Sequence, residues 1–486
     1  MKKYPTISIG YIYLPEINQH MRLNLFKKTS IFVMLFFANQ LKAQTIEPAK
    51  ADTSKPVKIE EKKANTLNIS ADMRVRTEYR HGYRNLAYQD TSSAFFVQQR
   101  TRINFDYKAK RFDFYVSLQD TRLWGQQDPR AGHGTIPSVT DVSSSTVSPY
   151  FFEAYAEPHL NDRWSVRIGR QRIMYDNQRL FAENDWRLAA NAHDAVRFIY
   201  NDKLKVNTEF IAAFNQSAEN IYTTNYAPNG FKNYKVLLNH YLNLKISKNF
   251  TLQTLNTADG YQSSDPKSYN STYMRYTNGG RIEYSSYNWY ATFSGYYQHG
   301  FDSTAKEISA FYFQPEIKYS GIKNLTIRLG AEYLSGQDST STKNNNFVPL
   351  YGVAHRFMGN MDFFTQFPTD VSNGGLLNPY LFFQYQTAKW SVRMENHLFY
   401  SHTLAAFKGK PDNNKYLGFE NDWRINFKPN SFTDIELGAC WATVTNSMVE
   451  VRNPKIANSE IEKYSKLPYW TYLSIKFTPS LAKLSF

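Results

Sequence analysis

The stretch ISADMRVRTEYR, residues 69–80, alternates strictly between two kinds of side chain. Side chains of an extended strand point to opposite faces with a period of two. One face would carry Ile69, Ala71, Met73, Val75, Thr77 and Tyr79, and the other Ser70, Asp72, Arg74, Arg76, Glu78 and Arg80. An ordinary half-buried strand has a polar face toward bulk water and an apolar face toward a core. Here one face is apolar along its whole length, and the opposite face carries many charged side chains. The strand must therefore have an apolar environment on one side and a polar environment on the other.

The same alternation recurs to the end of the chain and predicts eighteen strands. We expect them at residues 67–80, 96–109, 111–121, 150–158, 163–172, 193–201, 204–215, 234–246, 249–259, 272–284, 287–299, 308–319, 325–335, 377–387, 389–401, 416–427, 432–442 and 468–477.

The connections between these strands alternate long and short without exception. The short ones are at residues 108–110, 158–162, 201–203, 247–249, 285–287, 320–324, 387–389 and 428–431. The long ones are at residues 81–95, 122–149, 173–192, 216–233, 260–271, 300–307, 336–376, 402–415 and 443–467. Most short turns are followed by an aromatic residue or leucine: Phe112, Trp164, Leu204, Phe250, Trp289, Leu325, Trp390 and Phe432.

These features predict an all-β fold, a transmembrane antiparallel β-barrel of about 18 strands with short periplasmic turns and long extracellular loops. In such a barrel the apolar side chains face lipid and the charged side chains face a water-filled lumen. Closure of the barrel pairs the backbone groups of every strand. The turn-side aromatic residues fit an interfacial girdle. A β-propeller or sandwich would instead show polar outward positions and repeats of about 40–50 residues, and neither is present. We therefore expect outer-membrane lipid around the protein and assembly by the barrel-assembly machinery.

The first part of the chain predicts export. Residues 31–38, IFVMLFFA, follow Lys27 and Lys28 and precede LKA ending at Ala43, which is the order of a secretory signal. We expect a signal peptide region at 1–43, with Met21 a more natural start than Met1, a flexible periplasmic leader at 44–66, and the barrel at 67–486. The chain is basic, with net charge +15, but export disfavours nucleic acid as a partner.

Several segments resemble the alginate export family of outer-membrane barrels. They are QQRTRINFDY (98–107), SLQDTRLWG (117–125), FFEAYAEPHL (151–160), WSVRIGRQRIMYDNQRLFAENDWR (164–187), AHDAVRF (192–198), GAEYLSGQD (330–338) and FVPLYGVAHRFMGNMDFF (347–364). The resemblance implies an eighteen-stranded barrel. In the alginate-exporting type, an arginine-lined constriction passes a polyuronate to the medium, and many relatives have no assigned solute.

Inward arginines are the candidate pore-lining and anion-binding residues. If Arg80 pairs near Phe96, then Arg76 lies near Arg100 and Arg74 near Arg102. Like charges opposite one another are destabilising, so either inward carboxylates brace these arginines or part of the positive field attracts anions in transit. The candidate bracing carboxylates are Asp72, Glu78, Asp106, Glu153 and Glu157. Further inward arginines are Arg167, Arg197, Arg275, Arg281, Arg328 and Arg393.

Acidic residues also face inward, so the lumen holds nearly balanced charge, as in a general porin. They are Glu209, Glu283, Glu316, Glu332, Glu395, Glu420, Asp422, Asp434 and Glu436. The connection 336–376 is long and aromatic, which predicts that it packs, either into the mouth as a gate or as an extracellular cap. The ENDW segment at 183–186 has acidic residues that could bind calcium, but its spacing is not diagnostic.

No enzyme motif of the GxSxG, Walker, HExxH or CxxC type occurs, and we expect no catalysis and no cofactor. Cys440 is alone, which excludes an intramolecular disulfide. We expect a passive channel for a hydrophilic anionic polysaccharide, saccharide or small solute. The alternatives are a specific uptake porin for small organic acids or sugars, and a barrel with a surface-binding or structural role. A hydrolase with its residues on the outer wall is a weaker alternative, because the outward positions offer no obvious Ser–His pair.

Overall fold

The computed structural model describes residues 65–125, 149–216, 219, 221, 234–263, 271–338, 340–403 and 414–486. The predicted signal peptide region (1–43) and nearly all of the predicted leader (44–66) lie outside these residues. The strands are β1 (Thr66–His81), β2 (Ala94–Lys108), β3 (Phe112–Leu123), β4 (Tyr150–Pro158), β5 (Trp164–Gln171), β6 (His193–Asn201), β7 (Val206–Phe214), β8 (Val236–Lys245), β9 (Phe250–Gln262), β10 (Thr272–Ser286), β11 (Trp289–Phe301), β12 (Glu307–Ile322), β13 (Leu325–Leu334), β14 (Leu376–Gln386), β15 (Trp390–Tyr400), β16 (Tyr416–Asn430), β17 (Thr433–Val444), β18 (Tyr469–Phe477) and β19 (Ser480–Ser485).

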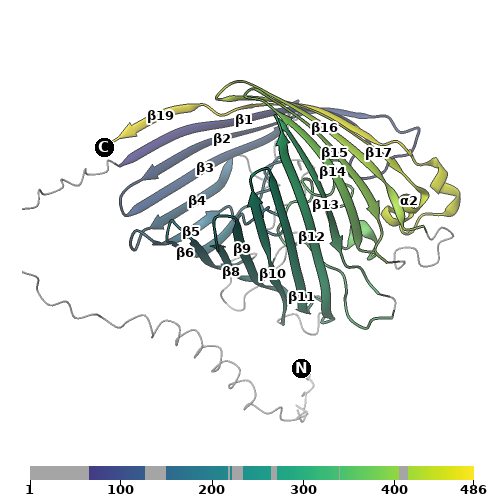
Figure 1. The fold of residues 1–486 in the computed structure, drawn as a ribbon, viewed down its shortest axis with the longest axis horizontal. Coiled ribbons are helices and arrows are strands. Elements are labelled where there is room, and N and C mark those ends of the chain that lie inside the picture. Colours follow the sequence, from purple (N-terminus) through teal and green to yellow (C-terminus); the bar gives the residue numbers. More distant parts are fainter. Residues whose placement is uncertain are drawn as a thin grey trace, which may run out of the picture. The chain divides into compact units, whose positions relative to one another are not determined.

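Each of strands β1–β18 pairs antiparallel with the strands next to it in this series, and β1 also pairs with β18, which closes the series. The sheet is therefore a closed barrel of eighteen strands, which confirms the predicted fold class (Figure 1). Closure gives each of strands β1–β18 a partner on both sides, which avoids the cost of several kcal/mol for an unpaired backbone group in lipid.

The residues after β18 form a further strand that the sequence pattern did not predict. After a break at Thr478 and Pro479, β19 pairs with Thr66–Ser70 of β1, beyond the part of β1 that pairs with β18. Strand β19 thus continues β18 along β1 and extends the closure to the start of the barrel wall (Figure 1).

Exposure alternates along the strands as the outer surface requires. On β12, Phe311 and Phe313 are 42% and 38% exposed, whereas Ala310 and Tyr312 are fully buried. Next to the short turns, outward aromatic rings pair across adjacent strands. These pairs are Trp164–Tyr200, Phe250–Tyr284, Trp289–Tyr319 and Trp390–Phe427, with ring centroids 4.4–4.8 Å apart. Amphipathic rings at this level are typical of a membrane interface.

Little helix is present in the described residues. A seven-residue helix, α2 (Asn446–Arg452), begins at Thr445, whose side chain accepts a hydrogen bond from the amide of Met448. Two short 3-10 turns are η2 (Thr369–Val371) and η4 (Asn458–Lys463). No helix among the described residues is long and apolar enough to cross a membrane.

The predicted pairing of the first hairpin was shifted by two residues. Arg80 lies opposite Ala94, and Arg74 lies opposite Arg100. Arg76 faces Gln98, and Asp72 rather than Arg74 faces Arg102. The 12 residues 82–93 that connect β1 and β2 form an irregular loop. The alternating pattern does not show at which residue each strand ends, so it leaves the pairing register of the hairpin open.

Candidate functional site

Two long loops fill much of the barrel interior, and the first is loop A, residues 172–192. Arg100 of β2 donates from Nη1 to Oδ1 of Asp185 (2.8 Å) and from Nη2 to Oδ2 (3.0 Å). Arg102 donates to the same Oδ1 at 2.7 Å. Burial alone would raise the pKa of Asp185, but Arg100, Arg102 and Arg74 hold that pKa well below its usual range. Loop A is therefore fixed to the wall through an ionised carboxylate.

The other two arginines of the hairpin bind the backbone of loop A. Arg74 donates to the carbonyl oxygens of Asp185 (2.7 Å) and Arg187 (2.8 Å), and Arg76 donates to that of Trp186 (3.0 Å). The Arg76 guanidinium also lies 4.2 Å from the ring centroid of Trp186. All four predicted arginines of the first hairpin thus converge on one short segment of loop A.

The rest of loop A is held by ion pairs on other strands. Arg172 binds Glu153 (2.7 Å) and Glu183 (2.6 Å), and Arg179 binds the fully buried Glu332 (2.7 Å). Glu183 and Asp185 of the ENDW segment are therefore engaged by arginines. That arrangement leaves the calcium hypothesis without support.

The second loop, loop B, comprises residues 335–375. Phe347, Tyr351, Phe357, Phe363 and Phe364 are each 2% exposed or less and belong to the largest buried apolar cluster of the described residues. This confirms that the connection packs. Whether it gates the pore stays a prediction.

Loops A and B also hydrogen-bond to each other through their backbones. The amide of Tyr351 donates to the carbonyl of Leu180 (2.8 Å), and the amide of Ala182 donates back to Tyr351 (3.2 Å). The side chain of Tyr351 continues to the wall, where its hydroxyl donates to Asp259 of β9 (2.6 Å). The two loops therefore form one inward structure with shared support.

Loop B is fixed to the opposite wall by backbone amides that donate to carboxylates of β16. The amide of Asn360 donates to Oδ2 of Asp422 (2.9 Å), and that of Met361 donates to Oε1 of Glu420 (2.7 Å). Inside the loop, His355 contacts Asp362 at 2.8 Å and Tyr83 donates to the same carboxylate at 2.5 Å. His355 stacks on Trp186, which again couples the two loops.

A cavity of about 290 Å³ remains between the loops and strands β1 and β15–β18. Its basic lining residues are Arg74, Arg356, Arg393, Arg424 and Lys476, and its acidic ones are Glu183, Asp185, Asp434 and Glu436. Among the described residues, neither Arg74 nor Arg356 has a carboxylate within 4.0 Å. Arg74 binds only backbone carbonyls, and Arg356 makes a single weak contact with the carbonyl of Asn177 at 3.5 Å.

The remaining predicted arginines are distributed around the wall, where each forms an ion pair. These pairs are Arg167–Glu157 (2.6 Å), Arg197–Glu209 (2.7 Å), Arg275–Asp259 (2.5 Å), Arg281–Glu283 (2.9 Å), Arg328–Glu316 (2.5 Å) and Arg393–Glu395 (3.3 Å). Of the predicted set, Arg74 and Arg393 line the cavity.

Three basic residues of the cavity were absent from the predicted set. Arg424 and Lys476 lie on the lumen side of β16 and β18, and strand alternation could have identified both. Arg356 lies in loop B within the segment GVAHRFMG, where no period indicates the direction of a side chain. Only the folding of loop B into the barrel brings Arg356 to the cavity.

The family model for alginate export matches residues 65–444 of this chain. The chain belongs to the alginate export family. No curated protein gives a significant match to the sequence.

Several solved structures are similar to this alginate export family member. OccAB4 of Acinetobacter baumannii is 11% identical with a TM-score of 0.56, covering 87% of this chain and 99% of the other. OccAB2 of the same organism is 13% identical with a TM-score of 0.55, covering 86% and 98%. OpdQ of Pseudomonas aeruginosa is 10% identical with a TM-score of 0.54, covering 86% and 98%. At this identity the likeness shows a shared fold.

Family membership and the closed eighteen-stranded barrel identify a channel of the Gram-negative outer membrane. In this alginate export family barrel the outer wall is apolar, the lumen is charged, and loops A and B narrow the passage.

Proposed function

We propose that the channel conducts hydrophilic anionic solutes, either acidic saccharides or small organic acids. One observation carries the proposal: Arg74 and Arg356 face the same cavity, and neither has a carboxylate partner among the described residues. A guanidinium presents a planar fork that matches a carboxylate, so both positions suit a carboxylate in transit.

The charges around the cavity favour the same assignment. The acidic lining residues have partners: Asp185 binds two arginines, Glu183 binds Arg172, and Glu436 accepts hydrogen bonds from Asn426 and Tyr472. Burial lowers the pKa of Arg356, and repulsion from Arg424 and Arg328 lowers it further. A bound anion would relieve this repulsion and would be concentrated locally by the positive field.

The size of the cavity favours a small solute while both loops are docked. At about 290 Å³ it lies at the small end of ligand sites in proteins. An uptake porin for small organic acids or sugars fits this docked arrangement as well as an exporter does. Passage of an acidic polymer would require loop A or loop B to move, and a passive pore does not determine direction.

Ion selectivity in a planar bilayer tests the proposal. The variant Arg356→Gln should shift the reversal potential in a salt gradient toward cations, because it removes an uncompensated charge from the narrowed lumen. The matched control is Arg163→Gln, an exposed arginine in the short turn before β5, which should leave selectivity unchanged. Short oligouronates should reduce the current of the native channel, and less so that of Arg356→Gln. Equal selectivity and equal block in the native and Arg356→Gln channels would refute an anion-binding lumen.

A further inference from the structure

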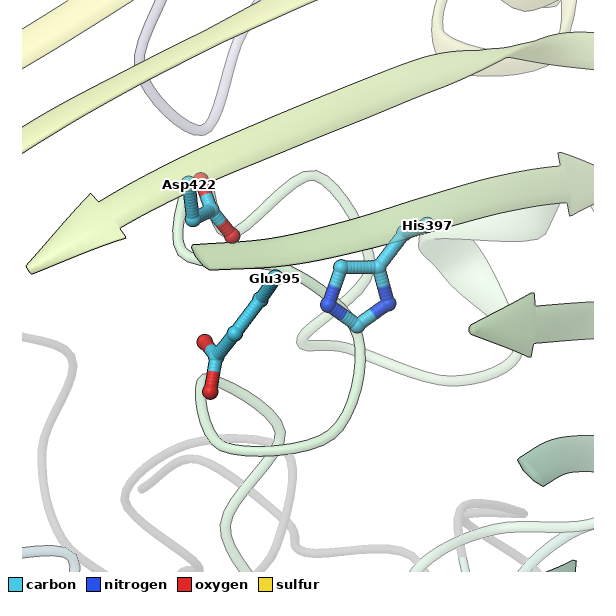
Figure 2. Close-up of side chains that lie close together, drawn as sticks. All are labelled: Glu395, His397 and Asp422. Carbon is cyan, nitrogen blue, oxygen red and sulfur yellow. The ribbon is translucent and has the colours of Figure 1, made fainter. Parts of the chain in front are cut away.

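We infer that Glu395, His397 and Asp422 form a binding site for a divalent transition-metal ion in the wall behind loop B. Figure 2 shows that the three side chains lie close together, and they come from the neighbouring strands β15 and β16. Their ligand atoms all lie within 4.8 Å of one another, and the residues are 2%, 1% and 0% exposed. A single ion could therefore contact all three.

Strand register produces this arrangement. Glu395 and His397 are two residues apart on β15 and point to the same face. In the β15–β16 pair, Glu395 lies opposite Asp422 and His397 lies opposite Glu420. Cys440 of β17 lies opposite Asp422 on the other side. The ligands thus come from rigid wall strands rather than from a loop.

The hydrogen bonds of His397 leave one of its ring nitrogens ready to bind a metal. Asn378 donates from Nδ2 to the carbonyl of Phe357 (2.8 Å), which fixes its Oδ1 as an acceptor. That oxygen lies 3.1 Å from Nδ1 of His397, so Nδ1 carries the proton and Nε2 keeps its lone pair. None of the described residues hydrogen-bonds to Nε2. Metal-binding histidines usually donate a hydrogen bond from the ring nitrogen that does not bind the metal to an oxygen atom.

The charges of the cluster are incompletely compensated. Oε1 of Glu395 pairs with Arg393 and Oε2 pairs with Arg424. Each carboxylate oxygen has a second lone pair that could bind a metal ion. Glu420 and Asp422 are fully buried, and neither forms an ion pair with a described residue. Oε2 of Glu420 and Oδ1 of Asp422 accept no hydrogen bond. Two adjacent buried carboxylates without a counter-charge are costly, so a cation or a proton must accompany them.

The ligand types indicate which cation fits. One imidazole and two carboxylates suit Zn²⁺ and neighbouring first-row divalent ions, whereas Ca²⁺ and Mg²⁺ prefer oxygen ligands alone. A tetrahedral zinc site needs a fourth ligand, and Glu420, Cys440 or water could supply it. Because Asp422 and Glu420 also accept the amides of Asn360 and Met361, an ion here would stabilise the docking of loop B.

Metal analysis of the full barrel, purified in detergent without a histidine tag and dialysed against zinc, tests the site. We expect about one zinc ion per barrel and an X-ray absorption spectrum with nitrogen and oxygen neighbours. His397→Gln and Asp422→Asn should each remove the bound zinc. Asn378→Leu, which removes the oxygen behind the imidazole, should weaken zinc binding about 10–100-fold. Calcium or magnesium in the same dialysis should not be retained.

The matched control is His193→Gln. His193 is also fully buried, with Nδ1 held by Tyr234 at 3.0 Å, but it is not part of this cluster. This variant should keep its zinc. Retention of zinc by a folded His397→Gln variant would place the metal elsewhere. A folded native barrel that holds no zinc after dialysis would show that a proton neutralises Glu420 and Asp422, and would overturn the inference without depending on any variant.

Discussion

Arg100 holds Asp185 through two hydrogen bonds, although the residues lie 85 positions apart and belong to the wall and to loop A. Arg100 is fully buried, and Asp185 is the nearer of its two carboxylate partners, at 2.8 Å against 3.5 Å for Asp72. The arginine cluster of β1 and β2 thus supports a loop inside the barrel. Loop A and its partner loop B set the width of the passage.

The variant Asp185→Asn should loosen loop A. Breaking a buried ion pair costs about 3–5 kcal/mol, and we expect the lower end because Asp72 stays near Arg100 at 3.5 Å. Amide hydrogen exchange in residues 184–188 should accelerate about 100-fold, since each 1.4 kcal/mol is tenfold. Single-channel conductance should rise as the loop leaves the lumen. Asp162→Asn, in an exposed turn, is the control, and unchanged exchange in Asp185→Asn would mean that the ion pair does not hold the loop.

The docking of loop A should strengthen as pH falls from about 6 to about 4. Burial raises the pKa of Asp176 to about 6, despite hydrogen bonds from Tyr241 (2.9 Å) and Tyr296 (3.4 Å) that favour the carboxylate. The docked loop therefore binds this proton more tightly than the free loop, whose carboxyl titrates near 3.9. The carboxylate weakens docking above pH 6, and the penalty, about 3 kcal/mol, disappears progressively as the pH falls to about 4.

Hydrogen exchange of loop A, corrected for intrinsic rates, measures this dependence. Protection should increase between pH 7 and pH 5 in the native barrel. Asp176→Asn should be protected at both values, because its amide does not ionise. Asp185 does not oppose the trend in this range, since its pKa is well below the usual value. Protection that decreases from pH 7 to pH 5 would mean that the docked loop binds the Asp176 proton less tightly than the free loop does.

The variant Gly359→Ala should release loop B from the wall. Gly359 has φ +78°, and a Cβ there would collide with the Glu420 carboxylate that anchors Met361. Gly125 has the same φ, and no atom of the described residues lies within 4 Å of a Cβ there, so Gly125→Ala is a control for backbone strain alone. Strain costs about 1–2 kcal/mol in each variant. Protease cleavage in loop B should increase only in Gly359→Ala. Equal cleavage in the two variants would mean that backbone strain, rather than the collision with Glu420, causes the effect.

Strand alternation was sufficient to predict the barrel wall. The eighteen predicted strands match β1–β18 closely, because lipid outside and water inside impose a period of two on every strand. Strand β19 was missed because SLAKLSF is short and follows Pro479. Its pairing depends on Thr66–Ser70 of β1, which extend beyond the part that β18 covers, rather than on its own pattern.

The lumen was less predictable than the wall, for a physical reason. Alternation indicates that Arg100 and Arg102 point inward, but not what they meet there. Their partner Asp185 comes from a loop with no period, and the aromatic content of loop B predicts that it packs but not against which wall. Arg356 therefore could not be placed from the sequence, whereas Arg424 could.

The outer wall gives a prediction that is independent of the loops. Leu329 lies in the middle of β13 and is 55% exposed, and Leu204 lies in a short turn and is 75% exposed. Arginine on the lipid face costs about 2–4 kcal/mol at the bilayer midplane and about 0–1 kcal/mol near the interface. Leu329→Arg should therefore lower the free energy of unfolding in lipid vesicles by the larger amount and Leu204→Arg by the smaller, measured by urea titration. In a water-soluble sheet both exposed positions would accept arginine at little cost. Equal small effects of the two variants would therefore mean that the outer face of β13 does not contact lipid.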